Sequence, residues 1–330
     1  MKHLSKLVDS LSRTTVAVLG DLVVDEFIHG EIARVSREAP VLILNHKGRE
    51  LVPGGAANAV MNLAALGVSV LPVGIVGDDE SGRALIKLFQ RQHIPVSGVQ
   101  RVKGWTTITK TRILAGHAHT VHQQVVRVDR TPDHAPDRHT MRELALAARK
   151  YATAADAFLV SDYGYGAASP EVLHAARSGK RNPCTDLPVT LDSRFRMTQF
   201  TGITAATPNE AEVEAALGVQ IGKNDARLAQ CGNKLREKMK LESLLVTRGR
   251  DGMALFTVAK SPLAIPVHGS DEAKDVTGAG DTVIATFTAA LAAGASAEDA
   301  ARLANVAGGI VVMKRGTATV SSAELKAALG

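Results

Sequence analysis

The chain has 330 residues, enough for one large α/β domain or two small ones with a substantial buried core. Hydrophobic residues make up 45% and charged residues 22%, which is typical of a globular enzyme. An aromatic content of 3% argues against a stacking platform for single-stranded nucleic acid. The net charge of +6 comes from dispersed lysines and arginines, so it favours small anionic molecules over DNA.

The ends and the cysteines of the chain indicate its compartment. Residues 1–13 lack an apolar run and a cleavage site, so we expect no signal peptide. Without a long apolar run, we also expect no membrane span. Cys184 and Cys231 stand apart, as free thiols in a reducing compartment do. We therefore predict a cytoplasmic protein with no nucleic-acid or membrane partner.

The N-terminal elements are an amphipathic helix and a buried strand. Leucines and a valine recur at helical spacing over residues 4–11, and residues 16–19 form an apolar run that ends in Gly20 and Asp21. Such runs suggest buried parallel strands, and ligands gather at the carboxyl ends of these strands. Asp21 and Asp25 would lie there. We interpret Asp21 as a turn carboxylate with local hydrogen bonds.

Two segments of mixed polarity predict a second, smaller sheet. Short strands are expected at 26–33 and 41–46, and residues 105–114 and 121–129 alternate as half-exposed strands do. A helix is predicted over 81–93, with Ser81 as its cap. The histidines of this region, His117, His119 and His122, lack an acidic or thiol partner nearby, so we do not favour a metal site there.

Pro53-Gly54-Gly55-Ala56-Ala57-Asn58 reads as a glycine turn that opens a helix. The glycines would let the backbone approach a ligand closely, and Asn58 offers both a donor and an acceptor. A hinge before an ordinary helix is the structural alternative.

Further strands again end in polar residues. Residues 157–162 and 187–192 are apolar runs ending in Asp162 and Asp192. Asn209 and Glu212 follow as N-x-x-E before a helix, a pattern that suits Mg²⁺ or an ordinary helix start. Residues 244–252 read as a buried strand and a glycine-containing turn.

The stretch from Asp275 to Thr282 is a glycine-rich turn that opens a long apolar helix, predicted over 281–293. The free amides of its first turn, together with the helix dipole, would form an anion site. Asp281 could accept a proton from a hydroxyl held beside it. This combination suits phosphoryl transfer to an alcohol, whereas an aspartate cap after a glycine loop is the structural alternative.

Asp275-Val276-Thr277-Gly278-Ala279-Gly280-Asp281-Thr282 resembles the C-terminal signature of PfkB, or ribokinase-like, sugar kinases, and the Gly54-Gly55 stretch resembles their N-terminal signature. The resemblance runs from about residue 14 to 320. It implies one domain over 1–330: a three-layer α/β fold with a mostly parallel sheet and a small β-sheet lid from about 26–52 and 105–130. The chain lacks both G-x-G-x-x-G after its first strand and a Walker motif, so it does not resemble dinucleotide-binding oxidoreductases or P-loop proteins.

The resemblance also implies the site residues and the ligands. Asp281 would be the catalytic base, with the amides of Gly278, Ala279 and Gly280 around the transferred phosphoryl group. The implied substrate-binding residues are Asp25, Gly54, Gly55, Asn58, Lys110, Arg112 and Asp192. The implied ATP-binding residues are Asn209, Glu210, Glu212, Thr247, Arg248, Gly249, Gly252, Asn305 and Arg194. Glu212 and Asn209 would hold Mg²⁺ through water, and Asp275 with the Thr277 backbone would frame a monovalent-cation site for an ion such as K⁺.

Within the family, S-R-x-A-P at residues 36–40, T-K-x-R at 109–112 and S-D-Y at 161–163 resemble heptose 7-phosphate kinases. The implied reaction is ATP-dependent phosphorylation of D-glycero-D-manno-heptose 7-phosphate at its anomeric hydroxyl. It would give the 1,7-bisphosphate of ADP-heptose and lipopolysaccharide core biosynthesis. A ribokinase or fructokinase is the alternative. Tyr165 stands where a lysine is expected, and Ser193-Arg194 replace the usual Pro-Lys.

Two further expectations concern the assembly and the extent of the chain. The chain ends at Gly330, so only the kinase step is implied. We also expect a homodimer through the lid strands, because unpaired strand edges invite pairing.

Overall fold

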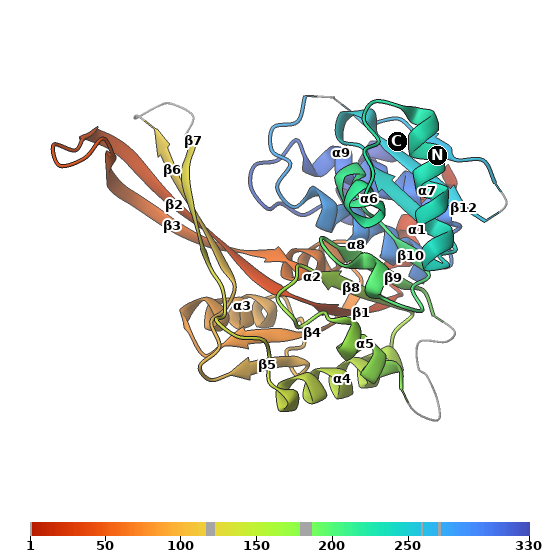
Figure 1. The fold of residues 1–330 in the computed structure, drawn as a ribbon, viewed down its shortest axis with the longest axis horizontal. Helices are drawn as coiled ribbons and strands as arrows, with labels where there is room; N and C mark the ends of the chain where they lie inside the picture. The colour runs from red at the N-terminus through yellow and green to blue at the C-terminus, as the bar shows by residue number, and fades with distance from the viewer. Residues whose placement is uncertain (1, 117–122, 179–186, 259, 270–271) are drawn as a thin grey trace.

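A large sheet forms the middle layer of the body in the computed structural model, which describes residues 2–116, 123–178, 187–258, 260–269 and 272–330 (Figure 1). Within these residues its nine strands follow the order β13-β12-β11-β10-β9-β8-β1-β4-β5. Neighbours from β11 to β5 run parallel, whereas β12 and β13 add antiparallel pairs. The strands are β1 (Thr15–Gly20), β4 (Ser69–Gly77), β5 (Val99–Val102), β8 (Ala157–Asp162), β9 (Val189–Ser193), β10 (Ala205–Ala206), β11 (Ser243–Thr247), β12 (Met253–Thr257) and β13 (Leu263–Ile265).

Helices cover both faces of this sheet, so two apolar cores enclose it. The first core takes side chains from α1 (Lys2–Leu11), α2 (Ala56–Ala65), α3 (Glu80–Arg91), α8 (Ala279–Ala292), α9 (Ala297–Val311) and α10 (Ser322–Leu329). The second takes them from α4 (Arg138–Ala152), α5 (Pro170–Arg177), α6 (Glu210–Leu217) and α7 (Asp225–Met239). The predicted three-layer α/β fold is confirmed. None of the helices in the described ranges combines the length and apolar character needed to cross a membrane.

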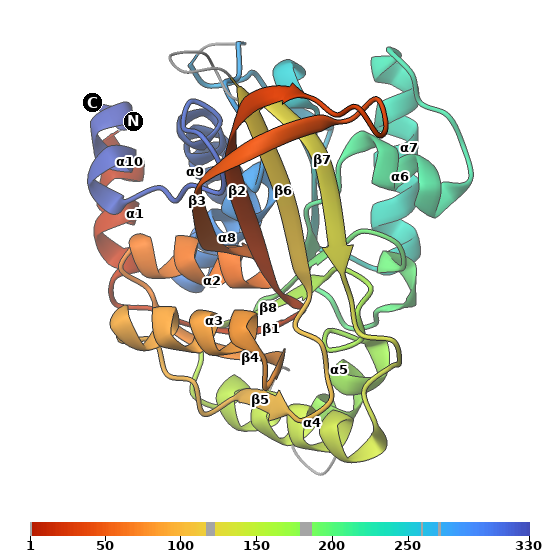
Figure 2. The same cartoon turned by 90° about the vertical axis from the view of Figure 1, so that its left-hand side faces the viewer.

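A second sheet projects from the body as a curved lid (Figures 1 and 2). Its described strands follow the order β3-β2-β6-β7, and they are β2 (Leu22–Val35), β3 (Leu42–Gly55), β6 (Thr109–Gly116) and β7 (Gln123–Arg130). The central pair, β2 and β6, is parallel, and both outer pairs are antiparallel. Only Asp21 separates β1 from β2, and β3 runs directly into α2. The lid is therefore joined to the body at the carboxyl end of β1 and the start of α2.

Two local predictions were wrong in detail. The strands predicted at 26–33 and 41–46 are longer, because residues 51–55 pair with residues 22–26. Pro53 is tolerated there because β3 is an edge strand, where a missing N–H leaves no partner unsatisfied. The cap of α3 is Asp79 rather than Ser81, since its carboxylate accepts the Gly82 amide at 2.8 Å and also contacts Thr107.

His117, His119, His122 and Cys184 lie outside the described residues. Cys231 is a buried free thiol on α7.

Candidate active site

Asp281 lies in the first turn of α8 and is 3% exposed. Its carboxylate accepts a hydrogen bond from Asn58 Nδ2 at 2.9 Å and another from Tyr163 Oη at 2.6 Å. Burial raises the pKa of Asp281 to about 6, and the two hydrogen bonds together with the positive charge of Arg194 oppose a larger rise. A carboxylate with this pKa is ionised at neutral pH and basic enough to accept a proton from a hydroxyl.

The turn before Asp281 needs its glycine. Gly278 is the N-cap of α8 with a φ of 77°, and a Cβ at this position would lie 2.5 Å from Asn58 Nδ2. The Ala279 amide donates to the Val276 carbonyl at 3.2 Å, whereas no acceptor within the described residues faces the amides of Gly278 and Gly280. Two of the three predicted cradle amides are therefore available to an anion.

The predicted sugar-binding residues of the lid base lie beside Asp281. Asp25 on β2 is 4% exposed, and a Cβ on Gly54 of the neighbouring strand would lie 2.5 Å from its Oδ2. Asn58, one turn into α2, connects this group to Asp281. Gly55 has a φ of 53° at the junction of β3 and α2. The fold thus brings residues from two lid strands and two helices to one place.

Lys110 and Arg112 on β6 have different partners. Arg112 forms an ion pair with Asp25, so its charge is already matched. Lys110 is half-buried and makes no ion pair within the described part of the chain; its Nζ lies 5.0 Å from the centre of the Tyr163 ring. Loss of hydration lowers the pKa of Lys110, and the charge of Arg194 lowers it further.

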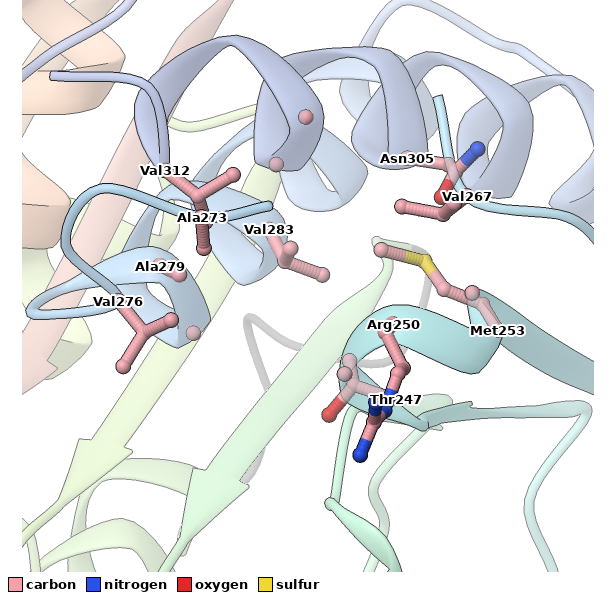
Figure 3. Close-up of a pocket in the computed structure, with 15 residues that line it drawn as sticks. Thr247, Arg250, Met253, Val267, Ala273, Val276, Ala279, Val283, Asn305 and Val312 are labelled. Carbon is pink, nitrogen blue, oxygen red and sulfur yellow. The ribbon is translucent and has the colours of Figure 1, made fainter. Parts of the chain in front are cut away.

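An apolar cavity of about 210 Å³ opens beside the start of α8 (Figure 3). Met253, Val276, Val283 and Val312 face it with their side chains. Of the residues predicted to bind ATP, Thr247, Gly249, Gly252 and Asn305 line it, and so do Ala279 and Gly280 of the catalytic turn. The cavity therefore adjoins the predicted anion cradle.

The other predicted ATP-binding residues lie outside this cavity. Arg248 pairs with Glu210 at 2.9 Å and with Asp225 at 2.8 Å. Asn209 and Glu212 form a capping box at the start of α6, in which each side chain accepts the other's backbone amide at 2.9 Å. This is the helix-start arrangement that the sequence left open as the alternative. Glu212 nevertheless keeps an oxygen that makes no hydrogen bond within the described residues.

A group of carboxylates surrounds Arg194, which follows β9. Loss of hydration raises the pKa of Asp192, and the charges of Glu212 and Asp281 raise it further. Loss of hydration also raises the pKa of Glu212. The positive charge of Arg194 opposes the rise in pKa of Asp192, Glu212 and Asp281, so Arg194 lies near all three acidic groups. The carboxylate oxygens of Asp192 and Glu212 are of the type that a hydrated Mg²⁺ would take as ligands. No cluster of three or more metal-ligating His, Cys, Asp or Glu side chains occurs in the residues that the structure describes.

Sequence reasoning missed three residues of this region. Tyr163 was named only as part of the S-D-Y segment and was given no role, although it follows the β8 carboxylate Asp162 at the sheet edge where ligands gather. Asn62 donates to Asn58 Oδ1 at 3.1 Å and so orients the Asn58 amide toward Asp281. Asp21 was expected to make local hydrogen bonds, but its carboxylate accepts amides of Tyr163, Tyr165, Ala167 and Ala168, far along the chain.

The fold is that of ribokinase-like proteins. Arabidopsis thaliana ribokinase complexed with ribose and ATP superposes with a TM-score of 0.74 at 18% identity, covering 96% of this chain and 98% of that one. Escherichia coli phosphofructokinase-2 in complex with potassium also gives 0.74, at 16% identity, covering 95% and 97%.

The family follows from the sequence match. The model of the pfkB family of carbohydrate kinases matches residues 14–324, and the chain belongs to this family of sugar kinases. It is 39% identical to the bifunctional protein HldE of Trichlorobacter lovleyi over 98% of this chain. The chain spans 65% of the length of that relative.

Proposed function

We propose that the protein phosphorylates D-glycero-D-manno-heptose 7-phosphate at the anomeric hydroxyl, with ATP as the phosphoryl donor. The observation that carries the transfer reaction is Asp281, a buried carboxylate fixed by Asn58 and Tyr163 at the start of α8, next to free amides and an apolar cavity. The choice of sugar rests on the segments at 36–40, 109–112 and 161–163. The similarity to HldE supports the same choice.

The acceptor hydroxyl would be held between Asp25, the Gly54-Gly55 backbone and Asn58, and Asp281 would take its proton as it attacks the γ-phosphorus. Each oxygen of Asp281 accepts one hydrogen bond and keeps a second lone pair for the hydroxyl. The amides of Gly278 and Gly280 would stabilise the developing negative charge, with that of Ala279 partly engaged by the turn. Arg194 and Asp192, at the end of β9, lie near Asp281.

The nucleotide would place its base in the cavity near Asn305 and its phosphates toward the start of α8. Thr247, Gly249 and Gly252 would lie along it, with Arg248 and Glu210 as an ion pair at the margin. Glu212 and Asn209 would hold Mg²⁺ through water, and the ion would neutralise phosphate charge. Asp275 and the Thr277 backbone would frame a monovalent-cation site. Turnover measured with and without K⁺ tests this site.

Coupled ADP release with Mg-ATP tests the proposal against heptose 7-phosphate, fructose 6-phosphate, ribose and fructose. We expect turnover with heptose 7-phosphate alone. Turnover with ribose or fructose instead would retain the kinase and discard the heptose assignment. The dependence on ATP supports a cytoplasmic location. The exposed valines of the lid strands support a homodimer.

Of Lys110 and Arg112, Lys110 is the better placed for the phosphate of the acceptor, because Arg112 is matched by Asp25 and Lys110 has no carboxylate partner in the described residues. Lys110→Met should raise KM for heptose 7-phosphate about tenfold or more, with a smaller effect on kcat, since a charge-assisted hydrogen bond to phosphate is lost. Lys103→Met, at an exposed lysine on the loop after β5, is the matched control. An unchanged KM in Lys110→Met would remove this residue from the acceptor site.

A further inference from the structure

Tyr163 stands at the centre of the side chains around the catalytic turn. It follows β8 directly, is 8% exposed, and places its Oη 2.6 Å from Asp281 Oδ1. The ionised carboxylate can only accept, so the phenol donates this hydrogen bond. The pKa of Tyr163 is raised by burial and by the charge of Asp281, so the phenol keeps its proton at neutral pH.

The ring and the backbone of Tyr163 are held from several sides. Lys110 Nζ lies 5.0 Å and the Arg194 guanidinium carbon 4.4 Å from the ring centre. At these distances the aromatic ring attracts both cations, and these contacts help to hold the ring in place. Its backbone amide donates to Asp21 at 2.9 Å. A Cβ on Gly55 would lie 3.3 Å from Tyr163 Cε2, so the ring packs closely on the glycine turn. The hydroxyl is therefore fixed in position before any ligand binds.

We propose that Tyr163 is a positioning residue for the phosphoryl-transfer base: its hydroxyl fixes the orientation of the Asp281 carboxylate and favours the ionised form. This inference rests on the proposed role of Asp281. Asn58 and Tyr163 each occupy one lone pair on a different oxygen, so the remaining lone pairs are left in a defined direction for the acceptor hydroxyl.

The charge of Asp281 depends on groups from several elements. Burial raises its pKa, and the hydrogen bond from Tyr163 is the largest influence that opposes this rise. The groups near it are Asn58 of α2, Asp25 of β2, Asp192 of β9 and Arg194 after β9, and Lys110 of β6 lies close to the Tyr163 ring. Tyr163→Phe leaves all of these in place and keeps the ring beside Lys110 and Arg194. It removes the donor to the carboxylate, and with it the contact of the same hydroxyl with Arg194.

The test is the pH dependence of kcat/KM for Tyr163→Phe relative to the wild type. The acceptor is whichever of the four sugars named above the wild type phosphorylates. Loss of a hydrogen bond to a charged group should move the acid limb upward by about one to two pH units. Turnover at about pH 6 should then fall about tenfold or more and recover toward the wild-type value at about pH 9. Taking the ratio of variant to wild type at each pH cancels the titration of the phosphate groups of ATP and the sugar.

Tyr151→Phe is the matched control. Tyr151 lies on α4, away from the turn before Asp281, and is also 8% exposed. Its hydroxyl makes a hydrogen bond of the same 2.6 Å length, with Ser97. Its profile should follow that of the wild type. A loss of activity in Tyr163→Phe by the same factor at every pH, or an acid limb that does not move, would overturn the positioning role.

A second measurement needs no sugar. In protein labelled with ¹³C at the aspartate carboxyl carbons, the Asp281 resonance is identified by its absence from the spectrum of Asp281→Asn. The midpoint of its pH titration is then measured in ligand-free wild type and in Tyr163→Phe. We expect a higher midpoint in Tyr163→Phe, and an equal midpoint contradicts the proposal. If no panel sugar is phosphorylated, the proposed function fails while this titration still decides the role of Tyr163.

Discussion

Asp281 must carry a negative charge where burial penalises charge. Its pKa is raised from 3.8 to about 6, so the folded state binds a proton more tightly than the unfolded chain does. The stability that this proton binding contributes is fully present below about pH 4 and is lost as the pH rises through about 6. At neutral pH the ionised carboxylate therefore costs about 3 kcal/mol of folding stability. This cost is consistent with the proposed role of Asp281 as a base, which requires the ionised form.

Asp281→Asn should therefore abolish turnover and yet stabilise the fold at neutral pH. The new amide can be accommodated, because its oxygen accepts from Asn58 while its NH₂ donates to the Tyr163 hydroxyl oxygen. The free energy of unfolding of the variant, relative to wild type, should rise by about 2–3 kcal/mol between about pH 4 and 7. Denaturant titrations at both pH values measure this difference.

Asp133→Asn, at an exposed carboxylate, is the control and should show no such rise. Retained turnover in Asp281→Asn would exclude this residue as the base.

At the scale of elements, the loop over residues 163–168 owes its shape to a carboxylate between two strands. Asp21 joins β1 to β2 and is 0% exposed. Its Oδ2 accepts the amides of Tyr163 and Tyr165 at 2.9 and 3.0 Å, and its Oδ1 accepts that of Ala167 at 2.9 Å. The residue that connects body and lid thus also fixes the loop carrying Tyr163, whose hydroxyl donates to Asp281, the proposed base.

Asp21→Asn should have the opposite effect on stability from Asp281→Asn, although burial raises the pKa of Asp21 to about 6 as well. All partners of Asp21 are backbone amides, which cannot turn into acceptors, so the new NH₂ leaves two buried donors without a partner. Relief of the buried charge offsets part of this loss. We expect a net destabilisation of about 2 kcal/mol at neutral pH and a lower kcat.

Equilibrium unfolding and steady-state kinetics measure the two effects. Asp156→Asn is the control, since its exposed carboxylate accepts the single amide of Thr15 and an amide oxygen can replace it. A variant at position 21 as stable and active as wild type would show that the loop does not depend on this carboxylate.

Local chemistry predicted much of this architecture. The run at residues 16–19 indicated β1, and the glycines before Asp281 indicated the start of α8, because periodicity and turn chemistry depend on neighbours in the chain. Long-range contacts decided the rest. Pro53-Gly54-Gly55 has turn chemistry, but pairing with residues 22–24 keeps it in β3. The orientation of Tyr163 depends on Asp21, 142 residues away, and no local pattern encodes that contact.

At the scale of the whole molecule, the two faces of the lid differ in character. Residues paired across neighbouring strands share a face. Asp25, Lys110 and Asp129 pair in register, as do Phe27, Arg112 and Arg127, which gives a charged face beside the active site. The alternate residues Ile28, Ile113 and Val126 also pair and form an apolar row on the opposite face, which carries the ion pair of Glu26 and Arg49 as well. Val126 and Val128 are 46% and 49% exposed there.

The exposed valines of this row predict a homodimer in which the lids of two copies cover each other, since exposed apolar patches and open strand edges mark association surfaces. We expect sedimentation velocity to show a dimer for wild type and a monomer for Val126→Asp/Val128→Asp, because each aspartate would lose hydration in the interface. Val258→Asp changes a valine that is 58% exposed on the body and should leave the dimer intact. A monomeric wild type, or a double variant that stays dimeric, would contradict assembly through this face. Because the charged face of the same strands carries Lys110, dilution below the dissociation constant of the dimer should also lower turnover per chain.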